Sequence, residues 1–432
     1  MIYIYKILTW ILFLVLMPFI PFIVVFSEEK RASLLFRLGI KNRVEAKNTE
    51  NKRIWIHALS VGEVKSAQPF LCSLKDKYND LDIVFTASTK TGFDMAVQLF
   101  ERQGILQRNH LGYFPFDIGF SIKKKLEKIS PDAVCLIETD LWPNFIFELK
   151  KRGIPVVLLN ARLSLRSLKG YRWFYSFSSR FFSSLSAILV QTEQDERRFR
   201  QLGVKKDKIS RIGNIKFDQF HEPPDSSERE NLKAKFYIED KTLLCLAGST
   251  HAGEERYLLN SYRLLKKQFP DLRMMIAPRD PKRSHSLGSI CVSLQLNAVE
   301  ITRLDKSSRS SDVIIVNAIG GLSKLYAICD VAFIGGSMVN QGGHNPLEAA
   351  AHSKPILYGK DMSDFSLISE LLLENKGARQ ILSQEEMTLE LGHLLSSRTL
   401  REKMGKLNFQ VFSQHRGAVL RTIGELEKLA IV

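Results

Sequence analysis

Residues 133–160 read AVCLIETDLWPNFIFELKKRGIPVVLLN. The stretch holds two strand-like runs, Ala133–Ile137 and Val156–Asn160, and Pro143 between them is well placed to begin a helix. Continuous apolar strands that are separated by helices are typical of a parallel sheet with both faces buried. This stretch therefore predicts an α/β fold.

The same alternation extends in both directions from this stretch. Helix-like segments lie at Val64–Lys77, Gly92–Phe100 and Ile118–Ile129. Further strands are predicted at Ile54–Ala58, Ile83–Thr86, Ala187–Gln191, Leu243–Ala247, Met274–Ala277, Val313–Val316, Val331–Ile334 and Pro355–Tyr358. The pattern pauses at 221–227, HEPPDSS, whose composition is typical of an interdomain linker. We therefore predict two doubly wound domains, with ligands at the carboxyl ends of their strands in a cleft between them.

The N-terminal segment Ile7–Phe26 carries no charge and is long enough to cross the ~30 Å hydrocarbon core of a membrane as a helix. The bases Lys30, Arg31, Arg37, Lys41 and Arg43 follow it and outnumber the acids, which favours a cytoplasmic location for the rest of the chain. A cleaved signal peptide is the alternative, but only Lys6 precedes the segment and no small-x-small cleavage site follows it. We predict an uncleaved single-pass signal-anchor.

These boundaries divide the chain into five parts. They are the anchor at 1–29, a Rossmann-like domain at 30–220, a linker at 221–230, a second Rossmann-like domain at 231–405 and a C-terminal helix at 406–432.

Composition limits the class of protein. Of the 432 residues, 45% are hydrophobic and 25% are charged, which excludes a disordered or fibrous chain. The net charge of +16 favours anionic partners, namely nucleic acid, anionic membranes or phosphorylated substrates. The five cysteines are widely spaced without a C-x-x-C pair, so we expect reduced structural thiols and no zinc site.

Two acidic positions in the first half follow predicted strands. Glu63 ends the sequence WIHALSVGE (55–63) at a helix start, where the helix N-terminus stabilises a carboxylate. Glu138 and Asp140 come directly after the strand Ala133–Ile137, and burying charge there is costly unless it is paired or functional. From spacing alone, catalysis and ordinary helix capping both stay open for these acids.

A lysine and a basic aromatic segment complete the first half. Lys216 lies in GNIKFD (213–218) just before the linker, and either contacts a phosphate or carboxylate or is a plain surface lysine. Across Arg162–Leu185, basic residues alternate with aromatic ones; we call this range the basic aromatic segment. It suits an anionic lipid surface, single-stranded nucleic acid, or a partly buried helix with a solvated basic face. The predicted anchor favours lipid.

The second half places glycine-rich turns after several strands, where backbone N–H groups can approach phosphates. These turns are Gly248–His251, Ala277–Arg279, Ala318–Leu322 and Gly335–Ser337. In GGHNPLEAAA (342–351), Asn345 fits an N-cap and Pro346 the first helical position. Glu348 then lies in the first turn, where it could accept hydrogen bonds from a ribose diol. None of these turns is a Walker loop or a G-x-G-x-x-G fingerprint.

Together these motifs resemble those of the 3-deoxy-D-manno-octulosonic acid (Kdo) transferase family, and the resemblance covers nearly the whole chain. The motifs that carry it are SVGE (60–63), ETDLWPN (138–144), NARLS (160–164), GNIKFD (213–218), PR (278–279) and GGHNPLEAAAH (342–352). The resemblance implies a GT-B fold and an inverting transfer of Kdo from CMP-Kdo to a lipid A precursor, lipid IVA, without a metal or cofactor. It implies lipopolysaccharide core synthesis at the cytoplasmic side of the inner membrane, and no motif encodes how many Kdo residues are added.

The resemblance also implies roles for single residues. Glu63 matches the family's general base, and Glu138 and Lys216 match its transition-state stabilisers. The segments that match CMP-binding segments contain Pro278, Arg279, Gly320, Gly321, Leu322, Asn345, Pro346, Leu347 and Glu348. The first domain would then bind the acceptor and the second CMP-Kdo. One departure is Asp140, where the family pattern often has Glu, and this puts acceptor fit rather than activity in doubt.

Two alternative functions stay open at this point. One is another GT-B enzyme that transfers a sugar from a UDP donor to a lipid, since only the resemblance selects CMP. The other is a non-catalytic membrane-bound protein that binds an anionic ligand. Acids at strand ends count against a nucleic-acid binder, because a polyanion would be repelled there.

Overall fold

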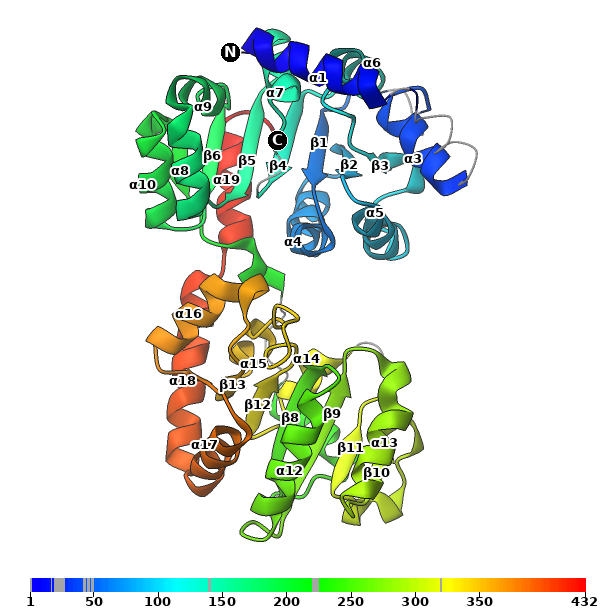
Figure 1. The fold of residues 1–432 in the computed structure, drawn as a ribbon, viewed down its shortest axis with the longest axis vertical. Helices are drawn as coiled ribbons and strands as arrows, with labels where there is room; N and C mark the ends of the chain where they lie inside the picture. The colour runs from blue at the N-terminus through cyan, green and yellow to red at the C-terminus, as the bar shows by residue number, and fades with distance from the viewer. Residues whose placement is uncertain are drawn as a thin grey trace. The chain divides into compact units, whose positions relative to one another are not determined.

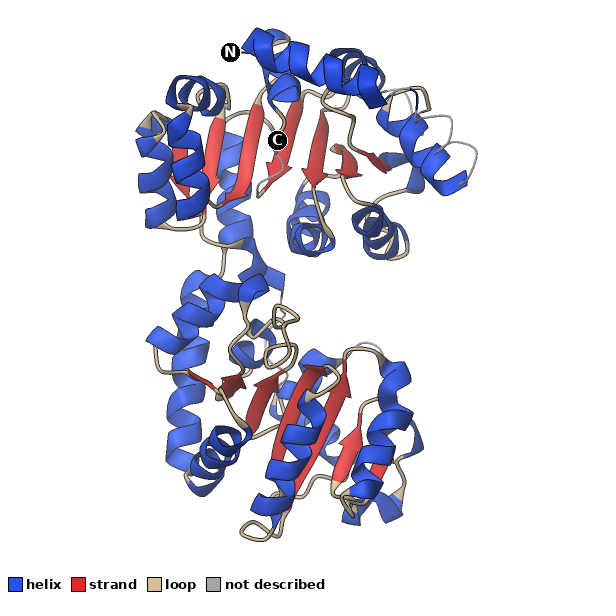
Figure 2. Cartoon of the chain, viewed as in Figure 1, coloured by secondary structure: helices blue, strands red, loops and turns tan. Residues whose placement is uncertain are grey.

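The computed structural model describes residues 2–16, 18, 28–41, 44, 47, 50–138, 141–219, 225–318 and 321–432. The chain forms two compact units. The first contains Met1–Gln219 together with Arg416–Val432, and the second contains Phe220–His415. Each unit is built around one parallel sheet, with helices packed on it (Figure 2).

The sheet of the first unit has the strand order β3-β2-β1-β4-β5-β6-β7. Its strands are β1 (Arg53–Ala58), β2 (Asp82–Ala87), β3 (Leu111–Tyr113), β4 (Ala133–Ile137), β5 (Val156–Ala161), β6 (Ala187–Val190) and β7 (Ile209–Arg211). The chain runs outward from β1 to β3 and then returns to the other side of β1 as β4. The topological switch point, where such sheets bind ligands, is therefore between β1 and β4.

Helices cover both faces of this sheet (Figure 1). They are α3 (Glu28–Arg37), α4 (Val61–Lys77), α5 (Lys90–Ala96), α6 (Gly119–Ile129), α7 (Pro143–Lys151), α8 (Leu165–Trp173), α9 (Tyr175–Phe182) and α10 (Glu193–Gln201). Successive β1 residues alternate between two cores, because Ile54 and Ile56 pack on one face and Trp55 on the other. All three side chains are fully buried, as expected for a central parallel strand.

The second unit repeats this plan with the strand order β10-β11-β9-β8-β12-β13-β14. Its strands are β8 (Leu243–Thr250), β9 (Leu272–Pro278), β10 (Ala298–Glu300), β11 (Val313–Ile315), β12 (Val331–Ile334), β13 (Ile356–Tyr358) and β14 (Ala378–Gln380). Its helices are α11 (Ser226–Lys235), α12 (Glu254–Lys266), α13 (Ser284–Ser293), α14 (Leu322–Tyr326), α15 (Leu347–Ala351), α16 (Ser366–Glu374), α17 (Gln384–Ser396) and α18 (Arg398–His415). The switch point of this sheet is between β8 and β12.

The C-terminal segment returns to the first unit. Residues 406–432 were predicted to form one helix, but α18 ends at His415 and α19 spans Ala418–Lys428. Gly417 between them has φ 84°, a left-handed conformation that a helix interior cannot contain and that glycine adopts at little cost. The carboxylate of Asp218 in the first unit accepts the N–H groups of Gly417 at 2.7 Å and of Val419 at 2.6 Å.

The N-terminal helix differs from the predicted membrane span. Helix α1 covers Ile2–Leu16, which is 15 residues, and Pro18 follows closely, where a ring without an N–H group disfavours continuation. In the part of the chain that the structure describes, no helix is both long and apolar enough to cross a membrane. The remainder of the predicted span, residues 17 and 19–26, lies outside the described residues, so the single-pass helix has no support here.

Helix α1 instead packs along the first unit, across α6 and α7 (Figure 1). The Tyr5 hydroxyl donates to Asp117 Oδ2 at 2.9 Å, and the Asn144 amide donates to Thr9 Oγ1 at 3.1 Å. The rings of Trp10 and Phe13 lie against Phe120 on α6, with centroid distances of 6.3 and 5.9 Å. One side of α1 therefore packs against the rest of the first unit.

Candidate functional site

The switch point of the first sheet brings two of the predicted acids to the carboxyl end of neighbouring strands. Glu63 lies in the first turn of α4, which follows β1, and Glu138 directly follows β4. Strands β1 and β4 are paired in parallel, with His57 opposite Leu136. Both acids therefore lie at the edge of the sheet where a doubly wound unit binds its ligand.

Glu63 is buried, with 6% of its surface exposed. Its carboxylate accepts the backbone N–H of Leu59, the residue before the N-cap Ser60. Ser60 makes no capping hydrogen bond with its own side chain, so Glu63 supplies the polar contact at this helix start. The bond also fixes the direction of the carboxylate, which a general base requires. This contact fits a carboxylate that serves the start of the helix, and it leaves the catalytic interpretation open.

Glu138 and Lys216 are close together. Lys216 Nζ lies 3.3 Å from Glu138 Oε1, and the two side chains are 21% and 17% exposed. Glu138 also has φ 60°, a left-handed conformation that costs a non-glycine residue about 1–3 kcal/mol and that recurs at functional sites. The plain surface-lysine interpretation of Lys216 is wrong, because the ammonium is held in a mostly buried ion pair.

Asn160 connects this pair to the sheet. It is fully buried at the end of β5 with φ 53°, and its amide donates to Glu138 Oε1 at 3.2 Å. Its Oδ1 accepts the N–H of Ile215, the residue before Lys216, at 3.1 Å. Gln191 in turn donates to the Asn160 carbonyl at 2.9 Å. Asn160 belongs to the NARLS motif, but no role was predicted for it; its only signal in the sequence is a polar residue at the end of an apolar strand.

The last residue of the ETDLWPN motif, Asn144, takes part in stabilising the first turn of α7. The carboxylate of Asp117 accepts the N–H groups of Asn144 at 3.1 Å and Phe145 at 2.8 Å, at the first turn of α7. Burial raises the pKa of Asp117, although these hydrogen bonds act in the opposite direction. Asp140, the departure from the family pattern, lies outside the described residues.

In the second unit, one buried acid joins two loops at the β8/β12 switch point. Glu254 is fully buried at the start of α12. Its Oε2 accepts the N–H groups of His251 at 2.9 Å and Gly336 at 2.8 Å, and its Oε1 accepts those of Ser337 at 3.0 Å and Met338 at 2.9 Å. Backbone donors in this number compensate the burial of a charge. Glu254 was not predicted, because three of its four backbone partners follow a different strand, β12.

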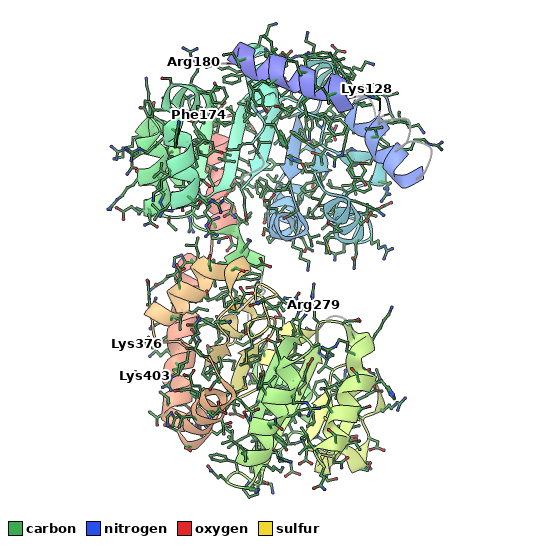
Figure 3. The ribbon with its side chains drawn as sticks, viewed as in Figure 1. Lys128, Phe174, Arg180, Arg279, Lys376 and Lys403 are labelled. Atoms are coloured by element: carbon green, nitrogen blue, oxygen red, sulfur yellow. The ribbon has the colours of Figure 1, made fainter. Side chains whose placement is uncertain are left out.

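The described residues among those predicted to bind CMP lie at or after the carboxyl ends of strands of this sheet. Pro278 ends β9, and the N–H of the exposed Arg279 donates to the Thr250 carbonyl at 2.9 Å (Figure 3). Gly321 has φ 81° and precedes Leu322, where α14 begins, whereas Gly320 lies outside the described residues.

The NPLE segment forms a short helix start after β12. Asn345 Oδ1 accepts the N–H of Leu347 at 3.1 Å, but Pro346 rather than Asn345 is the N-cap, because α15 begins at Leu347, one residue later than predicted. Leu347 is fully buried, whereas Glu348 is partly exposed in the first turn. Burial raises the pKa of Tyr326 well above its usual range, and the nearby charge of Glu348 raises it further. Within the described ranges, no group of three or more His, Cys, Asp or Glu side chains could hold a metal ion.

Comparisons with known proteins identify the family. A family model described as 3-deoxy-D-manno-octulosonic-acid transferase (Kdo transferase) matches residues 33–219. The 3-deoxy-D-manno-octulosonic acid transferase of Haemophilus influenzae is 32% identical over 410 residues, which are 95% of this chain and 94% of that relative. The chain belongs to the Kdo transferase family. The predicted family is thereby confirmed, the chain is a glycosyltransferase, and the non-catalytic alternative is excluded.

Solved structures agree with the fold of this Kdo transferase. UDP-GlcNAc 2-epimerase from Neisseria meningitidis, bound to UDP-GlcNAc, superposes with a TM-score of 0.58 at 14% identity, covering 87% of this chain and 100% of that one. MurG from Acinetobacter baumannii gives 0.53 at 14% identity, covering 87% and 99%. At this identity the likeness shows the fold alone, and it confirms the GT-B-like pair of Rossmann-like units.

Proposed function

We propose that this Kdo transferase moves Kdo from CMP-Kdo to a lipid A precursor, lipid IVA, with inversion and release of CMP, in lipopolysaccharide core synthesis. The observation that carries the proposal is the Glu138–Lys216 ion pair at the same switch point as Glu63. These three residues are the ones that the family motifs mark as base and stabilisers. The remaining steps follow from their chemistry.

Glu63 acts as the general base. Kdo is transferred at its ketosidic carbon, so the reaction passes through an oxocarbenium-like state that a lipid hydroxyl attacks. Glu63 takes the proton from that hydroxyl as the new bond forms. Because the Leu59 N–H fixes the carboxylate, the base does not have to reorient during the step.

Lys216 offsets negative charge that develops on the departing CMP or remains on the sugar carboxylate. Glu138 holds the ammonium and Asn160 holds Glu138, so the positive charge is positioned before the reaction begins. We assign no metal or cofactor to the reaction. Charge stabilisation comes from Lys216 and from donors at the nucleotide.

The second unit holds the donor. Arg279, Gly321-Leu322 and Asn345–Glu348 follow β9, β11 and β12, where helix starts and backbone N–H groups suit a phosphate. Gly320, although outside the described residues, belongs to the same proposed segment. Glu348 accepts hydrogen bonds from the ribose diol. Pro278, Pro346 and Leu347 support the backbone of this site, because Leu347 and Pro278 are buried.

We further propose that the first unit attaches to the cytoplasmic face of the inner membrane. Apolar residues of α1 with more than half of their surface exposed are Ile4, Ile7, Leu8, Ile11, Leu12, Leu14 and Val15. A helix docked on one side and apolar on the other suits a position in the plane of a membrane surface. The basic aromatic segment adjoins it, since the rings of Tyr5 and Phe177 are 6.4 Å apart. Within it Trp173 and Phe174 are 86% and 58% exposed.

The test is a transfer assay with CMP-Kdo and tetra-acylated lipid A precursor, in which mass spectrometry counts the sugars added. The Haemophilus influenzae relative serves as the positive control, and a UDP-sugar in place of CMP-Kdo tests the other GT-B alternative. We expect a product with at least one added Kdo and free CMP. The absence of product, under conditions in which the control makes it, would refute the proposal.

A further inference from the structure

We propose that His251 and His344 together form an anion subsite that binds the phosphate or the sugar carboxylate of the donor. The inference rests on the proposed function for the identity of that donor. The subsite itself is inferred from the geometry at the β8/β12 switch point. None of the family motifs used above gives either histidine a role.

The two imidazoles face each other directly. Their Nε2 atoms are 2.8 Å apart, and the ring planes lie within 9° of parallel with centroids 5.1 Å apart, so the rings meet edge to edge. His251 directly follows β8, and His344 lies in the loop after β12. These strands pair in parallel, with Gly248 opposite Ile334. The pair therefore lies at the edge of the second sheet where doubly wound units bind nucleotides and similar ligands.

The backbone holds both histidines in place. Glu254 accepts the N–H of His251 and those of three successive residues that begin at Gly336, which fixes the two loops to each other. The N–H of His344 donates to the Gly335 carbonyl at 3.1 Å. At Gly336, a Cβ would come within 3.1 Å of His344 Cδ2, so glycine lets the imidazole pack against the turn. The contact is built by buried groups rather than by two mobile side chains.

The chemistry of the contact favours an anion. Two ring nitrogens 2.8 Å apart share one hydrogen, so one Nε2 donates and the other accepts. Because each Nε2 points at the other, an anionic oxygen accepts from both nitrogens only when the rings turn apart to admit it and each ring carries its hydrogen on Nε2. Hydrogen bonds to a charged group are stronger than the neutral contact they would replace. Both rings are partly exposed, so a ligand can reach them.

The position of the pair matches the order of groups in a nucleotide sugar. The carbonyl of Thr250, directly before His251, accepts the N–H of Arg279, and Asn345 directly follows His344. The pair thus joins two segments that are assigned to CMP. A phosphate lies between the nucleoside and the sugar, so an anion subsite beside these segments is where the phosphate or the adjoining sugar carboxylate would lie.

Calorimetric titration of the full chain with CMP and with cytidine tests the subsite. If the pair binds the phosphate, His251→Ala and His344→Ala should each weaken CMP binding about ten-fold or more, as expected for a lost hydrogen bond to a charged group. Cytidine, which lacks the phosphate, should bind these variants as it binds the parent. His285→Ala, an exposed histidine on α13, is the matched control and should change neither ligand. Equal weakening of CMP and cytidine would mean that the pair only supports the loops, and would overturn the subsite.

Titration with CMP-Kdo separates the two sources of anion. If the pair binds phosphate, CMP and CMP-Kdo weaken equally; if it binds the carboxylate, CMP-Kdo weakens and CMP does not. Unchanged affinity for both would overturn the inference. Failure of the proposed function is a different result, because the parent itself would then bind neither ligand. If an alanine variant does not fold, ¹⁵N-histidine spectra of the parent decide: donor addition should shift two of the nine histidines, and cytidine should shift neither.

Discussion

The ammonium of Lys216 and the amide of Asn160 both contact Oε1 of Glu138, at 3.3 and 3.2 Å. These two contacts to one oxygen hold the Glu138 carboxylate against Lys216 and Asn160. Glu138 is therefore better suited to position Lys216 than to take a proton itself. Glu63, whose carboxylate accepts the N–H of Leu59, is the acid that the family resemblance assigns to proton transfer.

Asn160→Asp tests whether Asn160 positions the pair. Aspartate keeps the acceptor for the Ile215 N–H, but it cannot donate to Glu138 and places a second carboxylate against it. We expect kcat to fall about 10²-fold, the scale of a small misplacement of a catalytic group, with donor affinity unchanged. Steady-state kinetics and CMP-Kdo calorimetry measure the two effects. Asn375→Asp, at an exposed helix end, is the control; if Asn160→Asp loses activity only in proportion to lost folded protein, its role is structural.

Glu63→Gln should abolish transfer and leave the fold intact. The amide oxygen still accepts the N–H of Leu59, so the start of α4 keeps its polar contact. Loss of a general base costs ~10²–10⁴ in rate. CMP binding should stay normal, because the donor is assigned to the other unit. Near-normal turnover by this variant would remove Glu63 from the role of base.

Glu348→Ala should weaken CMP-Kdo binding more than it lowers stability. A hydrogen bond from ribose to a carboxylate contributes roughly 1.5–3 kcal/mol, and the variant loses this contribution from donor affinity. Calorimetry measures the affinity, and thermal melting provides the control. If donor affinity does not move, the ribose is bound elsewhere.

The sequence predicted the interior strands of both sheets and missed the outermost ones. The missed strands β3, β7, β10 and β14 read LGY, ISR, AVE and ARQ, and each is three residues long. Each lies at the end of a sheet and pairs on one side only, so it lacks the continuous apolar pattern of a strand buried on both faces. The packing of α19 in the first unit could not be predicted from the sequence either, because it depends on Asp218, about two hundred residues earlier.

Candidate residues were predictable where a strand end and a helix start coincide in sequence, as at Glu63 and Glu138. Lys216 was a candidate through its position just before the linker, but its catalytic role came from the family resemblance alone. Asn160, Glu254 and the histidine pair depend on contacts between loops of different strands, such as the one that joins His251 and His344 across 93 residues. No local pattern encodes such contacts, and the sheet order that creates them becomes known only from the structure.

The stability of the second unit should fall as pH drops from about 6.5 towards 4, in part because of His352. Burial lowers the pKa of His352 to about 4, and the charges of Lys354 and Arg229 act in the same direction. In the unfolded chain a histidine has a pKa of about 6.5. Between these values the unfolded state binds a proton that the folded state excludes, which favours unfolding. Melting curves of His352→Gln should therefore depend less on pH than those of the parent and of His393→Gln, an exposed control; parallel curves would contradict this.

Membrane attachment by the basic aromatic segment has a charge-matched test. Arg166, Lys169 and Arg172 are exposed on α8, beside the exposed ring of Trp173. Replacing the three bases with Ser should weaken liposome binding by about 1 kcal/mol per base on anionic vesicles, and the difference should fade as salt rises. The comparison variant replaces the exposed Lys376, Lys403 and Lys406 of the second unit with Ser and removes the same charge.

The full chain is the right material for this measurement, because deleting α1 would also leave the buried Asp117 without its Tyr5 partner. Flotation at two salt concentrations separates the contributions. Weaker binding of the α8 variant alone, at low salt, would support a basic surface beside an apolar α1. Equal loss in both variants would mean that net charge, not this surface, drives attachment. Unchanged binding of both would leave the exposed apolar side of α1 as the attachment, and α8 as a helix whose basic side faces only water.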